Sequence, residues 1–269
     1  MIIFKSINKL NKEVNFKANI GFVPTMGALH KGHISLINSS KIKCKKTLVS
    51  IFINPSQFNK KTDLKKYPKN LHKDIEILKK LKVDYLLLPK INEIYKNKKS
   101  KKINIIKKDK VLCAKYRPGH FEGVLAVINQ FLLNIKPKFM FLGEKDYQQI
   151  ILIKKFIKKK FKTQIVECKT VRLNNLVPYS SRNFYLSRNA IKDASFVSIS
   201  IYKLYLSIKK NFNKRFNISL VKNKIESKKI ITDYFEIRNK TNLSKNFNRK
   251  NFKIFIAYYL NDIRLIDNF

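Results

Sequence analysis

The sequence lacks any uninterrupted apolar run close to the roughly 20 residues that a membrane-spanning helix needs. Its first residues, Met1 to Lys5, have neither the hydrophobic stretch nor the cleavage site of a secretory signal peptide. Cysteine is scarce, and Cys44, Cys113 and Cys168 are odd in number and far apart, which fits neither a disulfide framework nor a metal cluster. We therefore expect a cytoplasmic protein from a reducing compartment, with no membrane partner.

Acidic residues are also few, with 17 of them against 59 basic residues and a net charge of +42. A charge of this size raises the alternative of a basic nucleic-acid-binding module. Arginine, which base readout prefers, stands at only eight positions, so most of the charge comes from lysines spread along the whole chain. Lys, Asn and Ile share A/T-rich codons, and codon bias explains their excess. We expect no specific nucleic-acid partner, although the charge would help to attract anions such as ATP.

Short apolar runs alternate with amphipathic segments over the first 170 residues, and 44% hydrophobic residues are enough for a large core. The predicted strands cover residues 20–23, 47–53, 83–88, 139–142 and 164–167. The predicted helices carry apolar faces made by Leu71, Ile75, Leu78 and Leu81, and by Val124, Val127, Ile128, Phe131 and Ile135. This alternation predicts an α/β fold with a doubly wound parallel sheet over residues 1–170. A helix through Val197, Ile201, Leu204 and Ile208, a second small helix, and strands at 234–238 and 252–259 predict a smaller α+β domain over residues 171–269.

The most informative segment runs from Thr25 to His33 and reads Thr-Met-Gly-Ala-Leu-His-Lys-Gly-His. It places two histidines three residues apart where the first predicted strand gives way to a helix. Backbone N–H groups at a helix N-terminus attract anions, and histidines one turn apart can face one ligand, so this junction suits a nucleoside triphosphate. The alternative is an ordinary loop in which Gly27 and Gly32 make turns and the histidines cap the helix.

Four further polar segments lie near predicted strand ends. Residues 50–58 include Gln57, whose amide suits a substrate with a hydroxyl and a carboxylate, or else form a simple Asn-Pro turn. Residues 117–121, Arg-Pro-Gly-His-Phe, open a helix and could be no more than a cap. In residues 143–149, Lys145 can neutralise phosphate, Asp146 can accept from a ribose hydroxyl, and Gln149 lies about one helical turn on. Residues 180–183, Ser-Ser-Arg-Asn, suit phosphate oxygens that a closing loop would contact.

Taken in order, these segments resemble the pantothenate synthetase, or pantoate–β-alanine ligase, family over essentially the full length. The matching motifs are Pro-Thr-Met-Gly-Ala-Leu-His-x-Gly-His, Ile-Phe-Ile-Asn-Pro-x-Gln-Phe, Tyr67-Pro68, Arg-Pro-Gly-His-Phe-x-Gly-Val, Gly-Glu-Lys-Asp-Tyr-Gln-Gln, Ser-Ser-Arg-Asn-x-Tyr-Leu and the terminal Arg264 to Asn268. The resemblance implies a Rossmann-like domain followed by a smaller C-terminal lid domain, as a homodimer. It also implies ATP-dependent ligation of (R)-pantoate and β-alanine through a pantoyl adenylate, with release of AMP and pyrophosphate. ATP enters as a substrate with Mg²⁺, and no tightly bound organic cofactor is expected.

The resemblance also assigns roles to individual residues. His33 is implied as proton donor, with His30 and Lys145 as its catalytic partners. Gln57 and Gln149 are expected to hold pantoate, Gln57 to lie near β-alanine as well, and Asp74 to help hold Mg²⁺. The implied ATP site comprises Met26, Gly27, Ala28, Leu29, His30, Lys31, Gly32, His33, Gly143, Glu144, Lys145, Asp146, Val171, Tyr179, Ser180, Ser181 and Arg182.

The chain departs from the family pattern before Ser180, where Asp-Gly and a small residue are usual. Here residues 174–179 read Asn-Asn-Leu-Val-Pro-Tyr, and we expect Asn to make the turn because it tolerates left-handed backbone better than most residues. Ala126 and residues 114–116 are further departures, and none of them removes a residue assigned to chemistry. The nearest rival function is a nucleotidyltransferase acting on a phosphorylated acceptor, which would need cationic contacts where Gln57 and Gln149 offer neutral amides.

Overall fold

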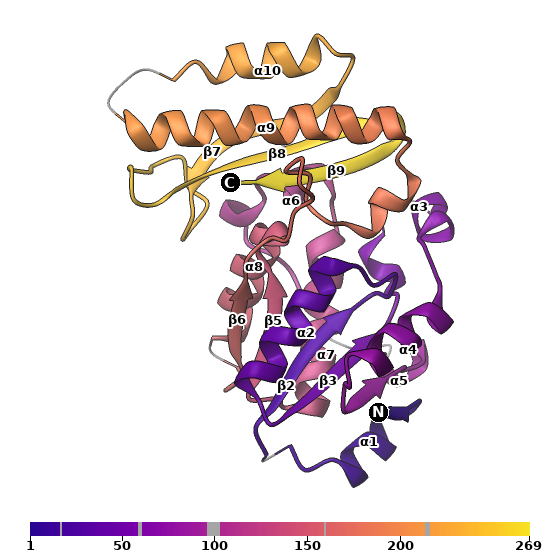
Figure 1. Cartoon of the computed structure of the whole chain (residues 1–269). Coiled ribbons are helices and arrows are strands. Elements are labelled where there is room, and N and C mark those ends of the chain that lie inside the picture. The colour runs from indigo at the N-terminus through magenta and orange to yellow at the C-terminus, as the bar shows by residue number, and fades with distance from the viewer. Residues whose placement is uncertain (17, 59–60, 96–102, 159, 213–215) are drawn as a thin grey trace. The chain divides into compact units, whose positions relative to one another are not determined.

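A computed structural model describes residues 1–16, 18–58, 61–95, 103–158, 160–212 and 216–269 of the chain (Figure 1). Internal contacts divide the chain into two compact units, Met1–Lys107 with Arg117–Lys169, and Lys108–Tyr116 with Thr170–Phe269. None of the described helices has the length and apolar character that a bilayer crossing requires.

The predicted division at residue 170 differs from these units in one segment, Lys108–Tyr116. This segment precedes residue 170 but belongs to the second unit. Within that unit, the buried Cys113 thiol lies 3.0 Å from the hydroxyl of Tyr234. The guanidinium of Arg264 donates to the same sulfur over 3.5 Å. These contacts join residues more than a hundred positions apart, so no local sequence pattern could assign this segment to the second unit.

The first unit is built on a six-stranded sheet in the order β1-β4-β3-β2-β5-β6, and every neighbouring pair is parallel. The strands are β1 (Ile2–Phe4), β2 (Ile20–Thr25), β3 (Lys46–Ile51), β4 (Tyr85–Leu87), β5 (Phe139–Gly143) and β6 (Gln164–Cys168). The predicted doubly wound parallel sheet is confirmed, and the five predicted strands correspond to β2 to β6. β1 was not predicted because its apolar run, Ile-Ile-Phe, has only three residues, which is short for a strand.

The side chains of β2 alternate between two covered faces. A Cβ atom at Gly21 would stand 2.2 Å from Ser40 Oγ of α2 (Lys31–Lys43), so α2 packs directly on that face. The next residue, Phe22, points the other way and contacts Phe131 of α7 (His120–Ile135), with ring centroids 5.3 Å apart. Because successive strand residues face opposite sides, α2 and α7 cover opposite faces of the sheet.

The remaining helices of this unit connect strands or extend the two helical layers. They are α1 (Ile7–Glu13), α3 (Lys61–Lys66), α4 (Leu71–Lys80), α5 (Ile91–Ile94) and α8 (Tyr147–Ile157), with short 3₁₀ turns η1 (Pro55–Gln57) and η3 (Glu144–Asp146). A third 3₁₀ turn, η2 (Lys107–Asp109), begins at Lys107 and continues into the segment that belongs to the second unit. In α4, Leu78 is fully buried as predicted, whereas Leu71 is 46% exposed. Leu71 is the first residue of the helix, which places it beyond the part of the apolar face that packs on the core.

The second unit is an antiparallel sheet in the order β7-β8-β9, packed against α9. Figure 1 shows α9 lying along these strands, with α10 beside it. The elements are α6 (Cys113–Tyr116), η4 (Ser181–Tyr185), α9 (Arg188–Lys210), α10 (Ile218–Glu226), β7 (Ile231–Asn239), β8 (Phe252–Leu260) and β9 (Ile263–Asn268). The predicted face of α9 supplies the core, since Val197, Ile201 and Ile208 are fully buried against β8. The smaller α+β architecture predicted here is confirmed.

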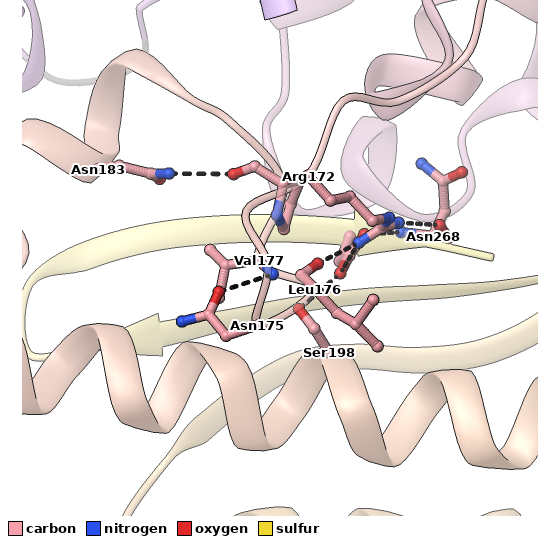
Figure 2. Close-up of polar contacts among 9 residues, drawn as sticks. Arg172, Asn175, Leu176, Val177, Asn183, Ser198 and Asn268 are labelled. Atoms are coloured by element: carbon pink, nitrogen blue, oxygen red, sulfur yellow. Dashed lines mark hydrogen bonds and ion pairs between the residues drawn. The ribbon is translucent and has the colours of Figure 1, made fainter. Parts of the chain in front are cut away.

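The turn that precedes Ser180 is held by Arg172 (Figure 2). Its guanidinium donates to both carboxylate oxygens of Asp267, at 2.8 and 2.9 Å, and to the carbonyl oxygen of Leu176 at 2.8 Å. The left-handed residue of the turn is Leu176, with φ of 68°, and not an asparagine as expected. Asn175 instead lies beside it, and its side-chain oxygen accepts from the N–H of Val177 at 3.4 Å. The bond from Arg172 to the Leu176 carbonyl stabilises a conformation that leucine disfavours by roughly 1–2 kcal/mol.

Candidate active site

Three polar segments meet at the carboxyl edge of the parallel sheet, around β2. In the sheet, β3 and β4 lie on one side of β2, and the next two strands along the chain, β5 and β6, lie on the other side. The gap between β2 and β5 is therefore a topological switch point, where open α/β sheets bind their ligands. The histidine segment follows β2, the Gln57 segment follows β3, and the Lys145 segment follows β5.

The two histidines stand side by side at the start of α2. His30 is the N-cap, and its Nδ1 accepts from the N–H of Gly32 at 3.1 Å. His33 lies one turn later, and the two ring centroids are 4.0 Å apart. The capping alternative considered for this segment thus holds for His30. Capping does not account for His33.

A tight, left-handed backbone turn links β2 to this helix. Gly27 and Ala28 have φ of 78° and 50°, and Thr25 Oγ1 accepts from the N–H of Gly27 at 3.2 Å. The Thr25 hydroxyl itself donates to the carbonyl oxygen of Ser50 at 2.8 Å, which ties the turn to the end of β3. A left-handed alanine costs roughly 1–2 kcal/mol, so the surrounding bonds must hold this turn in place.

The histidine pair is kept neutral at physiological pH. Burial lowers the pKa of His30 to about 2, helped by the charges of His33 and Lys145. Burial likewise lowers the pKa of His33 to about 4; Lys145 acts in the same direction, and Asp146 opposes it. These electrostatic interactions show that the structure brings Lys145 and Asp146 to the histidines, as the sequence predicted for the segment after β5. Lys145 and Asp146 also pair with each other, with Nζ and Oδ2 3.5 Å apart.

One ring nitrogen of this histidine pair lacks a hydrogen-bond partner within the described structure. Nδ1 of His33 is buried and has no hydrogen-bond partner among the described residues. Buried polar atoms are nearly always hydrogen-bonded, so an exception calls for an explanation such as a catalytic role or an ordered water. His33 therefore has one buried ring nitrogen whose hydrogen bonding the described residues leave incomplete.

The lowered pKa values predict how stability depends on pH. The unfolded histidines titrate near 6.5, whereas the folded pair titrates at about 2 and about 4. Between pH of about 4 and 6.5 the unfolded chain binds more protons, so the free energy of unfolding falls as the pH falls. Urea unfolding at several pH values in this window should show a steeper decline for the wild type than for a His30→Asn/His33→Gln variant. Equal slopes would contradict the lowered pKa values.

Residues outside the predicted site hold the Gln57 segment in place. The backbone carbonyl oxygen of Gln57 accepts from Nη2 of Arg117 at 3.2 Å, and His120 Nδ1 lies 2.7 Å from the same oxygen. Nη1 of Arg117 lies 2.9 Å from His120 Nε2, and an arginine can only donate. His120 therefore accepts at Nε2 and donates from Nδ1 to Gln57. The Arg-Pro-Gly-His motif has a positioning role here that the capping alternative did not include.

Asn54 and Gly123 fix the other side of the same segment. Asn54 is fully buried; its Nδ2 donates to the carbonyl oxygen of Gly123 at 3.1 Å, and its Oδ1 accepts from the hydroxyl of Tyr95 at 2.9 Å. A Cβ atom at position 123 would lie 2.3 Å from the carbonyl oxygen of Ser56, so only glycine allows α7 to approach this loop. The second glycine of Arg-Pro-Gly-His-Phe-x-Gly is Gly123, and a glycine within a helix is a signal of close approach. The sequence could not show that the approaching segment is the loop at Ser56.

The other predicted residues occupy three places. Gln149 is half-buried in the first turn of α8, after the strand on the opposite side of β2 from Gln57. Asp74 is buried in the first turn of α4 and accepts from the backbone of the histidine turn. In the second unit, the N–H of Tyr179 donates to the carbonyl oxygen of Val171 at 3.0 Å. Ser180 caps η4 by accepting from the N–H of Arg182 at 3.2 Å, and Nη1 of Arg182 donates to the carbonyl oxygen of Arg264 at 2.9 Å.

The first unit is a parallel sheet whose switch point carries a strand–turn–helix junction, two histidines and a lysine. This arrangement is typical of the class of α/β enzymes that bind nucleotides at the switch point of the sheet. Comparison with known proteins identifies the family. The family model described as pantoate-beta-alanine ligase matches residues 2–269. A pantothenate synthetase of Francisella philomiragia is 40% identical, over 100% of this chain and 97% of that protein.

Two further relatives extend the comparison. A crystal structure of the Francisella tularensis pantoate-beta-alanine ligase, complexed with beta-gamma ATP and beta-alanine, has a TM-score of 0.85 and 37% identity, covering 100% of this chain and 97% of that one. A bifunctional pantoate ligase/cytidylate kinase of Prochlorococcus marinus is 40% identical over 94% of this chain. This chain spans about half of that longer relative, or 51%.

The chain belongs to the pantoate–β-alanine ligase family. The family, the fold class and the ligase activity predicted from the sequence are confirmed by these matches. The activity is the joining of pantoate to β-alanine in the biosynthesis of pantothenate.

Proposed function

We propose that the chain performs this ligation with ATP in two steps, through a protein-bound pantoyl adenylate. A free carboxylate is a poor acyl donor, so it must first be converted to a mixed anhydride. An oxygen of the pantoate carboxylate attacks the α-phosphorus of ATP, a new P–O bond forms, and the bond to pyrophosphate breaks. The nitrogen of β-alanine then attacks the pantoyl carbonyl carbon, loses a proton, and displaces AMP. The arrangement of His30, His33 and Lys145 at the switch point is the observation that carries this proposal.

These three residues would stabilise the charge that accumulates on the phosphate oxygens in the first step. Fixed hydrogen-bond donors and cations at such a position lower the barrier because they need no reorganisation. In the free protein burial lowers the pKa of His33 to about 4, so its ring is neutral at pH 7. The negative triphosphate would raise the pKa of both histidines, since a nearby anion favours the protonated ring. This change would let His33 act as the proton donor implied by the family resemblance.

The substrates occupy the surrounding residues in this proposal. ATP lies along Met26 to His33 and Gly143 to Asp146. Val171 and Tyr179 to Arg182 are assigned to ATP as well, on the family resemblance. Gln57 and Gln149 bind the hydroxyl and carboxylate of pantoate, and Gln57 also lies near β-alanine. We further propose that the enzyme is a homodimer, as the family resemblance implies, and that it is cytoplasmic, as its three scattered cysteines indicate.

Mg²⁺ would enter with ATP and not through a dedicated protein cage. The described residues contain no group of three or more His, Cys, Asp or Glu side chains that could hold a metal ion. Magnesium bound to nucleotide phosphates usually keeps several waters and needs one or two protein carboxylates at most.

An omission assay tests the proposed function directly. AMP formation from ATP should require both pantoate and β-alanine for sustained turnover, and leaving out either one should stop it. Formation of ADP and phosphate would point to an acyl-phosphate ligase instead. Release of pyrophosphate with a phosphorylated acceptor, with the AMP moiety retained on that acceptor and no free AMP formed, would favour the rival nucleotidyltransferase.

A further inference from the structure

Asp74 is a buried carboxylate that the steps above do not use. It is 3% exposed and lies in the first turn of α4, after the N-cap Asn70. Its Oδ2 accepts from the N–H of Ala28 at 2.9 Å, and its Oδ1 accepts from the N–H of Leu29 at 2.8 Å. Burial raises the pKa of this carboxyl, and the two N–H groups act in the opposite direction. Both oxygens are thus directed at the backbone of the histidine turn.

The bonds made by Asp74 continue a series that begins at Thr25. Thr25 Oγ1 accepts from the N–H of Gly27, and Asp74 accepts from the next two N–H groups along the chain. A Cβ atom at Gly27 would lie 3.0 Å from Asp74 Oδ2, so glycine also permits the carboxylate to approach this closely. Three consecutive N–H groups are therefore fixed immediately before His30.

We propose that Asp74 is a positioning residue of the active site and not a ligand of Mg²⁺. It holds the left-handed turn at Gly27 and Ala28, and thereby sets where α2 begins and where the rings of His30 and His33 stand. The N–H groups of Ala28 and Leu29 are occupied by this carboxylate, so the phosphates are bound by other groups of the segment. The inference rests on the proposed function, because it assigns to Asp74 the placement of the histidines that act on ATP.

The test compares Asp74→Asn with the wild type. An amide offers one acceptor and directs an NH₂ group at a backbone N–H, so one of the two bonds is lost. We expect kcat to fall by roughly 10–100-fold, because a misplacement of about 1 Å in a catalytic group has an effect of this order. The Mg²⁺ concentration at half-maximal activity should stay within about twofold of the wild type. Glu76→Gln is the matched control, since Glu76 is an exposed carboxylate on the same helix and should leave both values unchanged.

A second measurement uses the substrate-free protein. Amide hydrogen exchange at Ala28 and Leu29 should be at least about tenfold faster in Asp74→Asn than in the wild type, with other core amides unchanged. This readout stands even if the omission assay fails, so failure of the inference and failure of the proposed function are distinguishable. If Asp74→Asn does not fold, Thr25→Val releases the neighbouring N–H of Gly27 and should lower kcat with the same unchanged Mg²⁺ dependence.

Two results would overturn the inference. One is a Mg²⁺ requirement that rises about tenfold or more in Asp74→Asn while the two amides stay protected, which would make Asp74 a metal ligand. The other is wild-type kcat and wild-type exchange in a folded variant, which would leave Asp74 without a role at this turn.

Discussion

The variant His33→Ala should fold normally and lose pantoyl-adenylate formation by roughly 10²–10³-fold, the usual effect of removing one well-placed electrostatic contact. Folding should survive because alanine favours helix at this position in α2 and because His33 Nδ1 makes no hydrogen bond within the described structure. Pyrophosphate release in a single turnover with saturating ATP and pantoate measures the effect.

The matched control for this variant is His72→Ala. His72 is exposed on α4, where it pairs with Glu76 across one helical turn. It should retain wild-type activity, which separates the loss of this particular ring from the loss of any histidine. Activity of His33→Ala within a few-fold of the wild type would contradict the assignment.

Substitution of Gln57 or Gln149 should weaken the use of pantoate and leave the binding of ATP unchanged. Gln57→Ala and Gln149→Ala each remove a proposed hydrogen bond to the hydroxyl or the carboxylate of pantoate, and a bond to a charged group contributes about 1.5–3 kcal/mol. The kcat/KM for pantoate should therefore fall by roughly 10–150-fold, while the KM for ATP changes little. Steady-state kinetics with each substrate varied in turn give both values.

Gln164→Ala is the matched control for these two variants. Gln164 is exposed on the edge strand β6, away from the carboxyl ends of β2, β3 and β5, and its loss should change neither constant. An effect on ATP with an unchanged response to pantoate would instead move Gln57 or Gln149 to the nucleotide site.

Much of this fold could be predicted because the relevant signals are local. The strands β2 to β6 contain short apolar runs, and the apolar faces of α7 and α9 repeat at helical spacing. The sequence itself therefore indicates which residues of these elements are buried. The membership of Lys108–Tyr116 in the second unit could not be predicted, because Cys113 is placed by contacts with Tyr234 and Arg264 far along the chain. The left-handed turn at Leu176 was missed for a related reason. Propensity favours Asn there, but the tertiary bond from Arg172 decides the conformation.

The same distinction applies to the site. The histidines, Lys145, Gln57 and Gln149 could be named because each lies in a motif at the end of a strand, and a parallel sheet brings such ends together. The contacts that hold these segments could not be predicted in the same way. The sequence named Asp74 only as an aid in holding Mg²⁺ and gave Arg117 no partner. Asp74 lies 46 positions from Ala28, and Arg117 lies 60 positions from Gln57, so these partners are found only in the folded chain.

Isotope exchange between pyrophosphate and ATP tests the central claim most directly, because it reports the reversible formation of the adenylate by itself. Exchange should require pantoate and proceed without β-alanine, and it should be lost in His33→Ala. AMP should then be released rapidly when β-alanine is added to the enzyme that holds the intermediate. Exchange that strictly requires β-alanine would contradict the adenylate mechanism and with it the role assigned to the switch-point histidines.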